Sequence, residues 1–444
     1  MTHRPSVAAA VALLGIVWPA AIAAQDAHYW TYGYGPVGQL TEGTLVGGVE
    51  DLSAVYYNPG ALALIEQPRF VIGLTSVQLA KMKIPAAAGP GLDVDQTIFD
   101  IVPSMVAGHL GADRGQADHF AFGFLARHDS DWDLGYTNVQ VSGSSPDAMA
   151  AFGRSRQRLV EYWVGGTWSR RLKERLAIGV SPFFAYRAQR SRRALTSEDI
   201  STGISTVESI GREYEYDHVR LLAKAGVAWR PGRWELGANV TVPGVKLWSD
   251  GKSIFNATVA GETPVPMLSA AAQTGLSATY HAPWSVGAGA TWRRPRRAIH
   301  TTVEWFSHVA EYDILEPDPA PVAGSSETIP LTYHGESRSV VCYGVGLEQH
   351  LGGRVILYGG AAHNESAYVA NRDTFAAWDL TDVTWGFTFD TGRAKVAFGL
   401  GYAWGSKGVQ QPLVLPTQTG PPPTLEAQFS RWTISVGASF KDGP

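Results

Sequence analysis

The sequence has a single cysteine, Cys342, and few charged residues for its length. One cysteine excludes an internal disulfide framework and any zinc site built from several cysteines. Charged residues make up 17% of the 444 positions, whereas a soluble protein usually carries about 25%. Part of the surface is therefore expected to face something other than water. The net charge of −4 also lacks the basic excess that is typical of a nucleic-acid-binding protein.

Long apolar runs are missing from everything beyond the N-terminal 24 residues. His3 and Arg4 precede an apolar run at residues 7–17, and small residues follow up to Ala24, with Ala21-Ile22-Ala23 as a cleavage motif. This order is typical of a secretory signal peptide. We therefore expect residues 1–24 to be removed, with cleavage after Ala23 or Ala24. No later stretch reaches the roughly 18 apolar residues of a transmembrane helix, so the mature chain is expected to be exported whole.

What the sequence does contain is polarity that alternates from one residue to the next. Small or polar residues occupy one face of residues 432–440, and the other face carries Trp432, Ile434, Val436, Ala438 and Phe440. Residues 394–404 and 284–292 repeat the pattern. A period of two over about ten residues predicts a strand that is long enough to cross a bilayer when tilted. The aromatic residues at both ends of the apolar faces are typical of interfacial girdles.

Short and long connections separate these stretches in strict alternation. Short polar turns are expected at residues 111–116, 170–174, 230–233, 293–297, 351–354 and 390–393. Longer segments rich in Ser, Thr, Gly, Pro and acidic residues lie at 81–102, 131–155, 191–215, 250–278, 313–335, 366–378 and 408–426. An up-and-down outer-membrane barrel has short periplasmic turns and long external loops. The pattern predicts an all-β, fourteen-stranded antiparallel transmembrane β-barrel over residues 69–440, followed by a short tail at residues 441–444.

The segment at residues 25–68, before the first expected strand, is unusually apolar for a periplasmic tail. A disordered tail is poor in aromatic and aliphatic residues, yet this one carries Tyr29, Trp30, Tyr32, Tyr34, Leu40, Leu45, Val46, Val49, Leu52, Val55, Tyr56 and Leu62. Such side chains need burial, and the barrel lumen is the available place. We therefore expect residues 25–68 to form a plug inside the barrel.

Residues 44–64 make the expectation more specific. Glu50-Asp51-Leu52-Ser53-Ala54 precedes Asn58-Pro59-Gly60-Ala61, and this run resembles the N-terminal hatch of the FadL/TodX family of outer-membrane transporters. Further matches are Val102-Pro103-Ser104-Met105, Ala177-Ile178-Gly179-Val180 and Ala282-Pro283-Trp284-Ser285-Val286-Gly287. The resemblance covers nearly the whole mature chain. It implies a fourteen-stranded barrel with a hatch, which passes long-chain fatty acids or aromatic hydrocarbons.

Two features depart from the family pattern. The usual Asn-Pro-Ala of the hatch is Asn58-Pro59-Gly60-Ala61 here, and the chain continues for four residues beyond Phe440. The first departure leaves the identity of the ligand open. The second concerns assembly rather than fold.

Alternation also indicates which side chains point into the lumen. They are mostly Gly, Ala, Ser and Thr, whereas a general porin lines its channel with charged side chains. Lys224 on the sixth expected strand and Arg187 on the fifth stand out as inward cations. A buried cation needs an anionic partner. Both residues are candidates for binding the carboxylate of a fatty acid, and a salt bridge to Glu50 or Asp51 of the plug is the alternative.

The expected external loop at residues 250–278 contains an apolar group of six residues: Ile254, Phe255, Val259, Val265, Met267 and Leu268. Exposed apolar clusters often mark binding sites, and the family resemblance implies an external capture groove in loops of this kind. Packing of the loop against itself is the alternative.

Signals for an enzyme are weak. Residues 33–38 satisfy the G-x-G-x-x-G pattern, but no strand precedes them and Pro36 opposes a helix start. His128 and Ser130 share a strand face, yet no third residue completes a hydrolytic triad. We therefore expect no catalytic site, and neither a cofactor nor a metal.

The preferred function is the uptake of long-chain fatty acids or other small hydrophobic molecules by passive diffusion through a plugged outer-membrane barrel. The alternatives are a general porin or a structural barrel. The expected partners are a hydrophobic small molecule, outer-membrane lipid and the barrel-assembly machinery, with no nucleic acid.

Overall fold

The structure is a computed structural model that describes residues 27–65, 68–87, 92–111, 117–141, 148–201, 204–261, 266–369, 378–410 and 424–441. The expected signal peptide, Val265 and residues 442–444 lie outside the described residues. Two short α-helices, α2 (Gly35–Gly38) and α3 (Ala54–Tyr57), and one 3-10 helix, η1 (Pro59–Leu64), precede the strands. Within the described part of the chain, no helix is long and apolar enough to cross a membrane.

The remainder of the described chain consists of strands and their connections. The strands are β1 (Pro68–Ile84), β2 (Val94–Val102), β3 (Met105–Leu110), β4 (Asp118–Val141), β5 (Ala148–Lys173), β6 (Leu176–Ser201), β7 (Ile204–Trp229), β8 (Trp234–Ala260), β9 (Met267–Leu276), β10 (Ser285–Arg294), β11 (Arg297–Phe306), β12 (Val309–Leu315), β13 (Ala320–Pro321), β14 (Thr328–Ile329), β15 (Tyr333–Ser337), β16 (Val340–His350), β17 (Val355–Asn364), β18 (Leu380–Asp390), β19 (Ala394–Gln410) and β20 (Thr424–Lys441).

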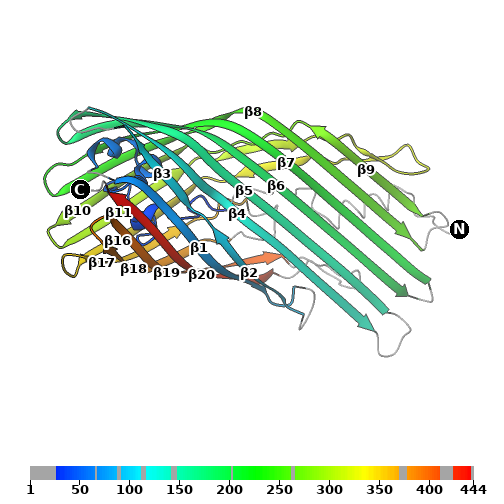
Figure 1. Cartoon of the computed structure of the whole chain (residues 1–444). Coiled ribbons are helices and arrows are strands. Elements are labelled where there is room, and N and C mark those ends of the chain that lie inside the picture. The colour runs from blue at the N-terminus through cyan, green and yellow to red at the C-terminus, as the bar shows by residue number, and fades with distance from the viewer. Residues whose placement is uncertain are drawn as a thin grey trace.

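Antiparallel pairing closes these strands into a barrel. β20 pairs with β1, and the ladder continues around the ring until β8 pairs with β10. Two positions of the wall are each built from two strands in succession, β2 with β3 and β9 with β10. Among the described residues the wall therefore has fourteen strand positions, and Figure 1 shows the resulting cylinder. The fold class expected from the sequence is confirmed.

The alternation that predicted the strands is also the alternation of the two faces of the wall. Along β11, residues switch strictly between exposed and buried. Ile299, Val303 and Trp305 lie on the exposed outer face. His300 and Glu304 lie on the inner face and are buried. An apolar exterior with a more polar interior is the arrangement that lipid on one side and a packed lumen on the other require.

The strands differ greatly in length, and this corrects the sequence-based expectation of long external loops. β5, β6 and β7 have 26 residues each, whereas β10, β11 and β17 have 10. Most of residues 131–155, 191–215 and 250–278, which were expected to be loops, belongs to strands. β6 and β7 stay paired as far as Ser201↔Ile204, so the backbone groups of these polar segments are satisfied by the ladder. Figure 1 shows β4 to β8 extending beyond the shorter strands.

Of the expected short turns, 230–233, 351–354 and most of 390–393 lie between strands as predicted, whereas most of 170–174 and of 293–297 belongs to strands, and residues 112–116 lie outside the described residues. The ends of the barrel differ slightly from the expected limits. β7 and β8, for example, are joined through residues 230–233, and β18 and β19 through residues 391–393. β1 begins at Pro68, the last residue of the expected plug, and β20 ends at Lys441, the first residue of the expected tail. Lys441 Nζ contacts Asp390 Oδ2 at 2.6 Å.

The N-terminal segment, residues 27–65, lies inside the ring. Its helix α2 contacts β1, β19 and β20, and η1 contacts β4 to β7 on another side of the ring. The small inward residues of the wall leave room for it. A Cβ placed on Gly386 or Gly399 would meet Leu40 Cδ2 at 2.7 or 2.2 Å. Figure 1 shows this segment, in blue, near the end of the barrel where the short turns lie.

Candidate functional site

The motif Asn58-Pro59-Gly60-Ala61 is a joint between the N-terminal segment and the wall. Asn58 Nδ2 donates to Val46 O at 3.0 Å and to Val227 O at 2.9 Å, and its Oδ1 accepts from Gly60 N at 3.1 Å. A Cβ on Gly60 would meet Gly226 O at 2.7 Å, so the close approach to β7 requires glycine here. The motif thus holds the segment against the wall, and its role as a hatch stays a prediction.

Three arginines near the short turns also hold the N-terminal segment. Arg171 donates twice to Ala63 O, at 3.0 and 2.7 Å. Arg230 donates to Leu64 O and to Val49 O. Arg293 Nη2 lies 2.8 Å from Glu50 Oε1, and Lys395 Nζ lies 3.8 Å from Glu50 Oε2.

The cations singled out from the sequence, Arg187 and Lys224, point inward and are buried. Neither takes Glu50 or Asp51 as its partner, which corrects the alternative considered from the sequence. Arg187 Nη1 lies 3.0 Å from Glu161 Oε2, and Lys224 Nζ lies 3.6 Å from Glu304 Oε1. Both carboxylates come from the barrel wall, so strand-to-strand pairs neutralise these cations. Their proposed role toward a ligand stays untested.

Two further arginines join this group, which we call the lumenal charge cluster and which consists of Arg127, Glu161, Arg187, Arg220, Lys224 and Glu304. Arg220 Nη2 donates to Glu161 Oε1 at 2.7 Å. Arg220 Nε and Nη1 are buried and have no hydrogen-bond partner among the described residues. Arg127, Glu161, Arg220, Lys224 and Glu304 line a cavity of about 50 Å³. With four basic and two acidic side chains, the cluster is suited to an additional anion.

Sequence reasoning missed Arg127 and Arg220, although a signal was present. Arg220 shares the parity of Leu222 and Lys224 on β7, and Arg127 shares that of Leu125 on β4. A register shift between Ala126 and His128 makes Arg127 the extra residue of a β-bulge, which turns both Arg127 and His128 inward. Such a bulge is not visible in the alternation of residue types.

The wall is interrupted at this bulge. β3 pairs with β4 only as far as Met105↔Leu125, and Ala126 N donates to Ser104 O at 3.0 Å. Beyond that point β2 pairs with β1 alone, and the described residues form no ladder between β2 and β4. Pro103, which has no N–H group, lies between β2 and β3 and marks the change of direction.

The N-terminal segment covers the bulge from inside. The Tyr34 hydroxyl donates to Ala126 O at 2.9 Å, and the Tyr32 hydroxyl donates to Asp129 O at 2.9 Å. Arg127 in return donates from Nη1 to the hydroxyls of Tyr34 and Tyr56 at 3.0 and 2.7 Å, and from Nη2 to Tyr29 O at 3.0 Å. Side chains of the N-terminal segment thus satisfy carbonyl groups that a neighbouring strand would otherwise pair.

A cavity of about 160 Å³ lies beside the interruption. Ile98 on β2 and Trp132 on β4 line it from the two strands that do not pair with each other. Tyr32 lines it from the N-terminal segment. Its other apolar lining residues are Ala27, Ala80, Leu159, Tyr368, Trp378, Leu380 and Phe429. The other half of its lining residues are polar or charged, among them Asp100, Asp129 and Asp131, so the cavity joins an apolar surface to polar groups beside the interrupted wall.

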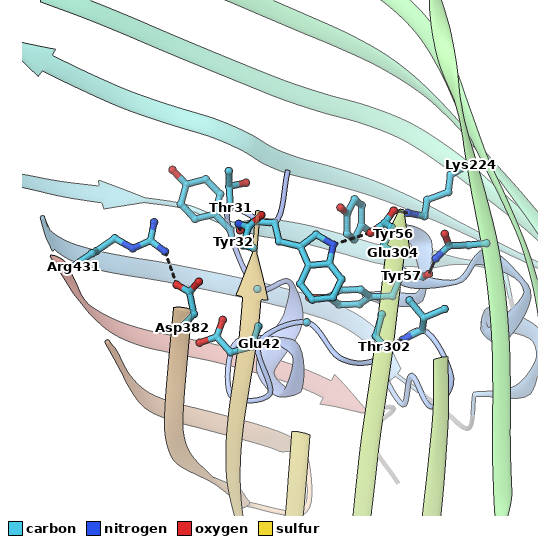
Figure 2. A pocket seen from close by; sticks show the side chains of 17 residues that line it. Thr31, Tyr32, Glu42, Tyr56, Tyr57, Lys224, Thr302, Glu304, Asp382 and Arg431 are labelled. Carbon is cyan, nitrogen blue, oxygen red and sulfur yellow. Dashed lines mark hydrogen bonds and ion pairs between the residues drawn. The ribbon is translucent and has the colours of Figure 1, made fainter. Parts of the chain in front are cut away.

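A smaller cavity of about 40 Å³ lies deeper, between the N-terminal segment and the wall. Figure 2 shows Lys224 and Glu304 on one side of it, and Glu42 beside the Arg431–Asp382 ion pair on the other. Glu42 has a backbone φ of 51°, a conformation that is uncommon for a residue other than glycine. Burial and the neighbouring Asp382 carboxylate raise the pKa of Glu42 from 4.5 to about 8, against the opposing effect of Arg431.

The apolar residues expected in an external loop lie in a paired hairpin instead. Ile254, Phe255 and Val259 belong to β8, and Met267 and Leu268 belong to β9, with Val259 opposite Met267. Phe255 and Met267 are buried against a cluster that includes Ala320, Val322 and Leu331. Leu268 is exposed. The short strands after β11 therefore cover part of this group, and its role in ligand capture stays a prediction.

Fold and site together define a closed fourteen-stranded barrel whose lumen is filled by its own N-terminal segment and whose wall is interrupted beside a partly apolar cavity. No family model matches the sequence, and no curated protein matches it.

Solved structures do match the fold. The toluene transporter TodX of P. putida is similar over 93% of this chain and 99% of its own, with a TM-score of 0.63 and 12% sequence identity. A FadL homologue of Pseudomonas aeruginosa matches over 94% and 100%, with a TM-score of 0.60 and 11% identity. The toluene transporter TbuX of Ralstonia pickettii matches over 92% and 98%, with a TM-score of 0.56 and 13% identity. These likenesses confirm the fold that the resemblance to the FadL/TodX family implies.

Proposed function

We propose that this protein is an outer-membrane channel for the passive uptake of small hydrophobic molecules, long-chain fatty acids among them. The signal peptide expected from the sequence, the apolar outer face and the closed barrel support a place in the outer membrane. The solved structures that share the fold include transporters of toluene and a FadL homologue. Shared fold alone does not fix a function, so the proposal depends on the site.

One observation carries the proposal: a partly apolar cavity of about 160 Å³ lies where the ladder between β2 and β4 is missing. Its apolar side chains, Ile98, Trp132 and Phe429 among them, stabilise a hydrophobic molecule by about 25 cal/mol for each Å² of apolar area removed from water. The interruption also gives that molecule a route toward the lipid that avoids the periplasmic end. We therefore propose that ligands leave the lumen sideways through the wall.

The N-terminal segment acts as the hatch in this proposal. It packs against several sides of the ring and is held by Asn58, Arg171, Arg230 and Arg293. An open porin needs a continuous water-filled passage lined by polar side chains. A lumen filled by a packed, tyrosine-rich segment does not favour such a passage, so we prefer a plugged transporter to a general porin.

For an acidic ligand, the lumenal charge cluster supplies a head-group site. Arg187 and Lys224 remain members of that site, but the hydrogen bonds not already used come from Arg220 Nε and Nη1. A carboxylate beside Arg220 and Arg127 would balance the excess of basic side chains. A charge-assisted hydrogen bond of this kind contributes about 1.5–3 kcal/mol.

Filling the 160 Å³ cavity tests the proposal. Ala80 lines that cavity and is buried, so Ala80→Trp places a large side chain in the route. Ala225→Trp is the matched control, because Ala225 lies on the exposed outer face of β7. We expect Ala80→Trp to reduce the uptake of labelled oleate and of labelled naphthalene by cells at least tenfold, and Ala225→Trp to leave both unchanged.

Both variants must show the same heat-modifiable gel migration as the unmodified protein, which establishes that the barrel is assembled. Unchanged uptake through an assembled Ala80→Trp barrel would remove the sideways route. Rapid entry of glucose through the unmodified protein would instead favour the porin.

A further inference from the structure

Five arginines gather on the outer surface of β5 and β6, and we call them the arginine strip: Arg154, Arg156, Arg158, Arg190 and Arg192. All five are exposed, with side-chain exposures of 63% for Arg190 and 70% for Arg192. They share the outward face because they have the parity of Val164 on β5 and of Phe184 on β6, which are exposed to the surroundings of the barrel. The strip therefore faces away from the lumen and from the proposed transport route.

The register of the two strands places like charges directly opposite one another. Arg158 pairs with Arg190, and Arg156 pairs with Arg192. Side chains in such positions lie about 5 Å apart at Cβ, and like charges there are destabilising. No acidic residue lies between the arginines of β5 and those of β6 at these paired positions. An anion placed along the seam would relieve the repulsion.

The carboxylates near the strip lie on the flanking strands, and they form ion pairs with four of its five arginines. On the β4 side Arg154 pairs with Asp133 and Arg156 with Asp131. On the β7 side Arg190 Nε lies 3.3 Å from Glu215, and Arg192 Nε lies 3.6 Å from Glu213.

Arg158, in the middle of the strip, has no carboxylate within 4.0 Å among the described residues, although it lies opposite Asp131 in the register and is attracted by the Asp129 carboxylate. The guanidinium groups of Arg190 and Arg192 each touch a carboxylate through Nε. Donors at the centre of the seam thus remain for a partner outside the chain.

The height of the strip along the barrel indicates what that partner is. On β5 the outward residues from the short turns upward run through Val164, Tyr162 and Val160 before Arg158. On β6 they run through Phe184, Tyr186 and Ala188 before Arg190.

Tyrosines of this kind mark the interface between acyl chains and head groups. The hydroxyls of Tyr162 and Tyr186 donate to Asp129 and Asp217, which supports a polar environment at their level. Four residues farther along a strand is about 13 Å, or about 9 Å along the membrane normal for a strand tilted by about 45°. In the proposed orientation this brings Arg158 and Arg190 from the interface to the level of the outer head groups.

We propose that the arginine strip binds the phosphate groups of a phosphorylated glycolipid in the outer leaflet. The planar guanidinium fork matches phosphate oxygens in pairs, and such charge-assisted hydrogen bonds are strong. A phosphate above the seam of β5 and β6 contacts arginines of both rows and offsets their repulsion. This inference rests on the proposed place in the outer membrane and is independent of the transported ligand.

Lipid retention by the full-length protein tests the inference. The purified barrel in a neutral detergent is titrated with diphosphoryl lipid A, and native mass spectrometry counts the bound lipid. The variant Arg158→Gln/Arg190→Gln removes the centre of the strip. The matched control is Arg170→Gln/Arg233→Gln, which removes two exposed arginines at the opposite end of the barrel.

We expect the strip variant to bind diphosphoryl lipid A at least tenfold more weakly than the unmodified protein, and the control to bind it normally. Dephosphorylated lipid A should bind weakly to all three proteins. Equal binding of diphosphoryl lipid A by all three would overturn the inference. Displacement of the lipid by an equal concentration of inorganic phosphate would also overturn it, because the strip would then be a site for free phosphate rather than for a membrane lipid.

Discussion

Glu161 shows, at the residue scale, how a buried charge is arranged in this lumen. Its carboxylate receives Arg187, Arg220 and the indole Nε1 of Trp163, all within 3.0 Å. A buried ion pair is costly unless additional hydrogen bonds satisfy it, and this carboxylate is satisfied on both oxygens. Arg220 is not, because two of its nitrogens have no hydrogen-bond partner among the described residues. The unsatisfied donors make Arg220 the sharper test of a head-group site than Arg187 or Lys224.

Replacing Arg220 with methionine should separate acidic ligands from neutral ones. Arg220→Met keeps the approximate length of the side chain and leaves Glu161 paired with Arg187, whereas changing Lys224 removes the cation that faces Glu304. We expect the affinity for oleate, measured by calorimetry, to fall about ten- to a hundredfold, which corresponds to the 1.5–3 kcal/mol of a charge-assisted hydrogen bond. Methyl oleate, which has no negative charge, should bind as before. An equal loss for both molecules would show that the variant disturbs packing and not a head-group site.

The sequence predicted correctly which way Lys224 and Arg187 point, but not which residues they pair with. Alternation placed Lys224 and Arg187 inward because a strand that separates two environments has a strict period of two. It did not show their partners, because Glu161 and Glu304 lie on other strands and only the register brings them together. The parity of Leu125 already places Arg127 inward, whereas His128 faces the same side only because of a bulge, which inserts one residue into the ladder and leaves no trace in composition.

At the element scale, the N-terminal segment carries a titratable carboxyl group, that of Glu42, at a position with an unusual backbone conformation. Glu42 combines a left-handed backbone with a position beside the Asp382–Arg431 pair (Figure 2). Its pKa is raised to about 8, so the docked segment favours the neutral carboxyl. When folding raises the pKa of a group, that group stabilises the folded state fully at pH values below its ordinary pKa. The stabilisation is lost as the pH rises through the raised pKa. For Glu42 this range extends from 4.5 to about 8.

The docked N-terminal segment should therefore loosen in mildly alkaline solution. We expect full-length protein in planar bilayers to show more frequent conducting events at pH 9 than at pH 6.5, because ionised Glu42 then faces Asp382. Glu42→Gln keeps the side chain neutral and should keep the event frequency low at both pH values. The same rise with pH in Glu42→Gln would assign the effect to another group.

The elements themselves were predictable in number and order but not in length. Short turns contain Gly, Pro and charged residues in a narrow window, and those at residues 230–233 and 351–354 were found with the expected limits. The segments between β4 and β8 are rich in Ser, Thr and charged residues, which is typical of loops, yet they continue as strands. Polarity no longer alternates clearly along them, and pairing with a neighbouring strand decides their structure. The apolar residues from Ile254 to Leu268 were misplaced in a loop for the same reason.

The whole molecule combines a closed wall with one interrupted seam. Among the described residues, pairing of β20 with β1 and of β8 with β10 closes the ring, whereas β2 has no ladder to β4 and β9 pairs within the sheet with β8 alone. The unpaired carbonyl groups at the seam are covered by hydroxyls of the N-terminal segment. The N-terminal segment therefore both fills the lumen and covers the unpaired carbonyl groups of the wall.

Conductance of the barrel with and without its N-terminal segment tests the plugged channel most directly. A protein that keeps its signal peptide but lacks residues 25–64 should still assemble, because the strands of the wall pair among themselves from Pro68 onward. In planar bilayers the full-length protein should conduct almost no ions, and the shortened protein should conduct in large discrete steps. Large steps from the full-length protein, or an equally silent shortened barrel, would contradict a lumen closed by residues 27–65.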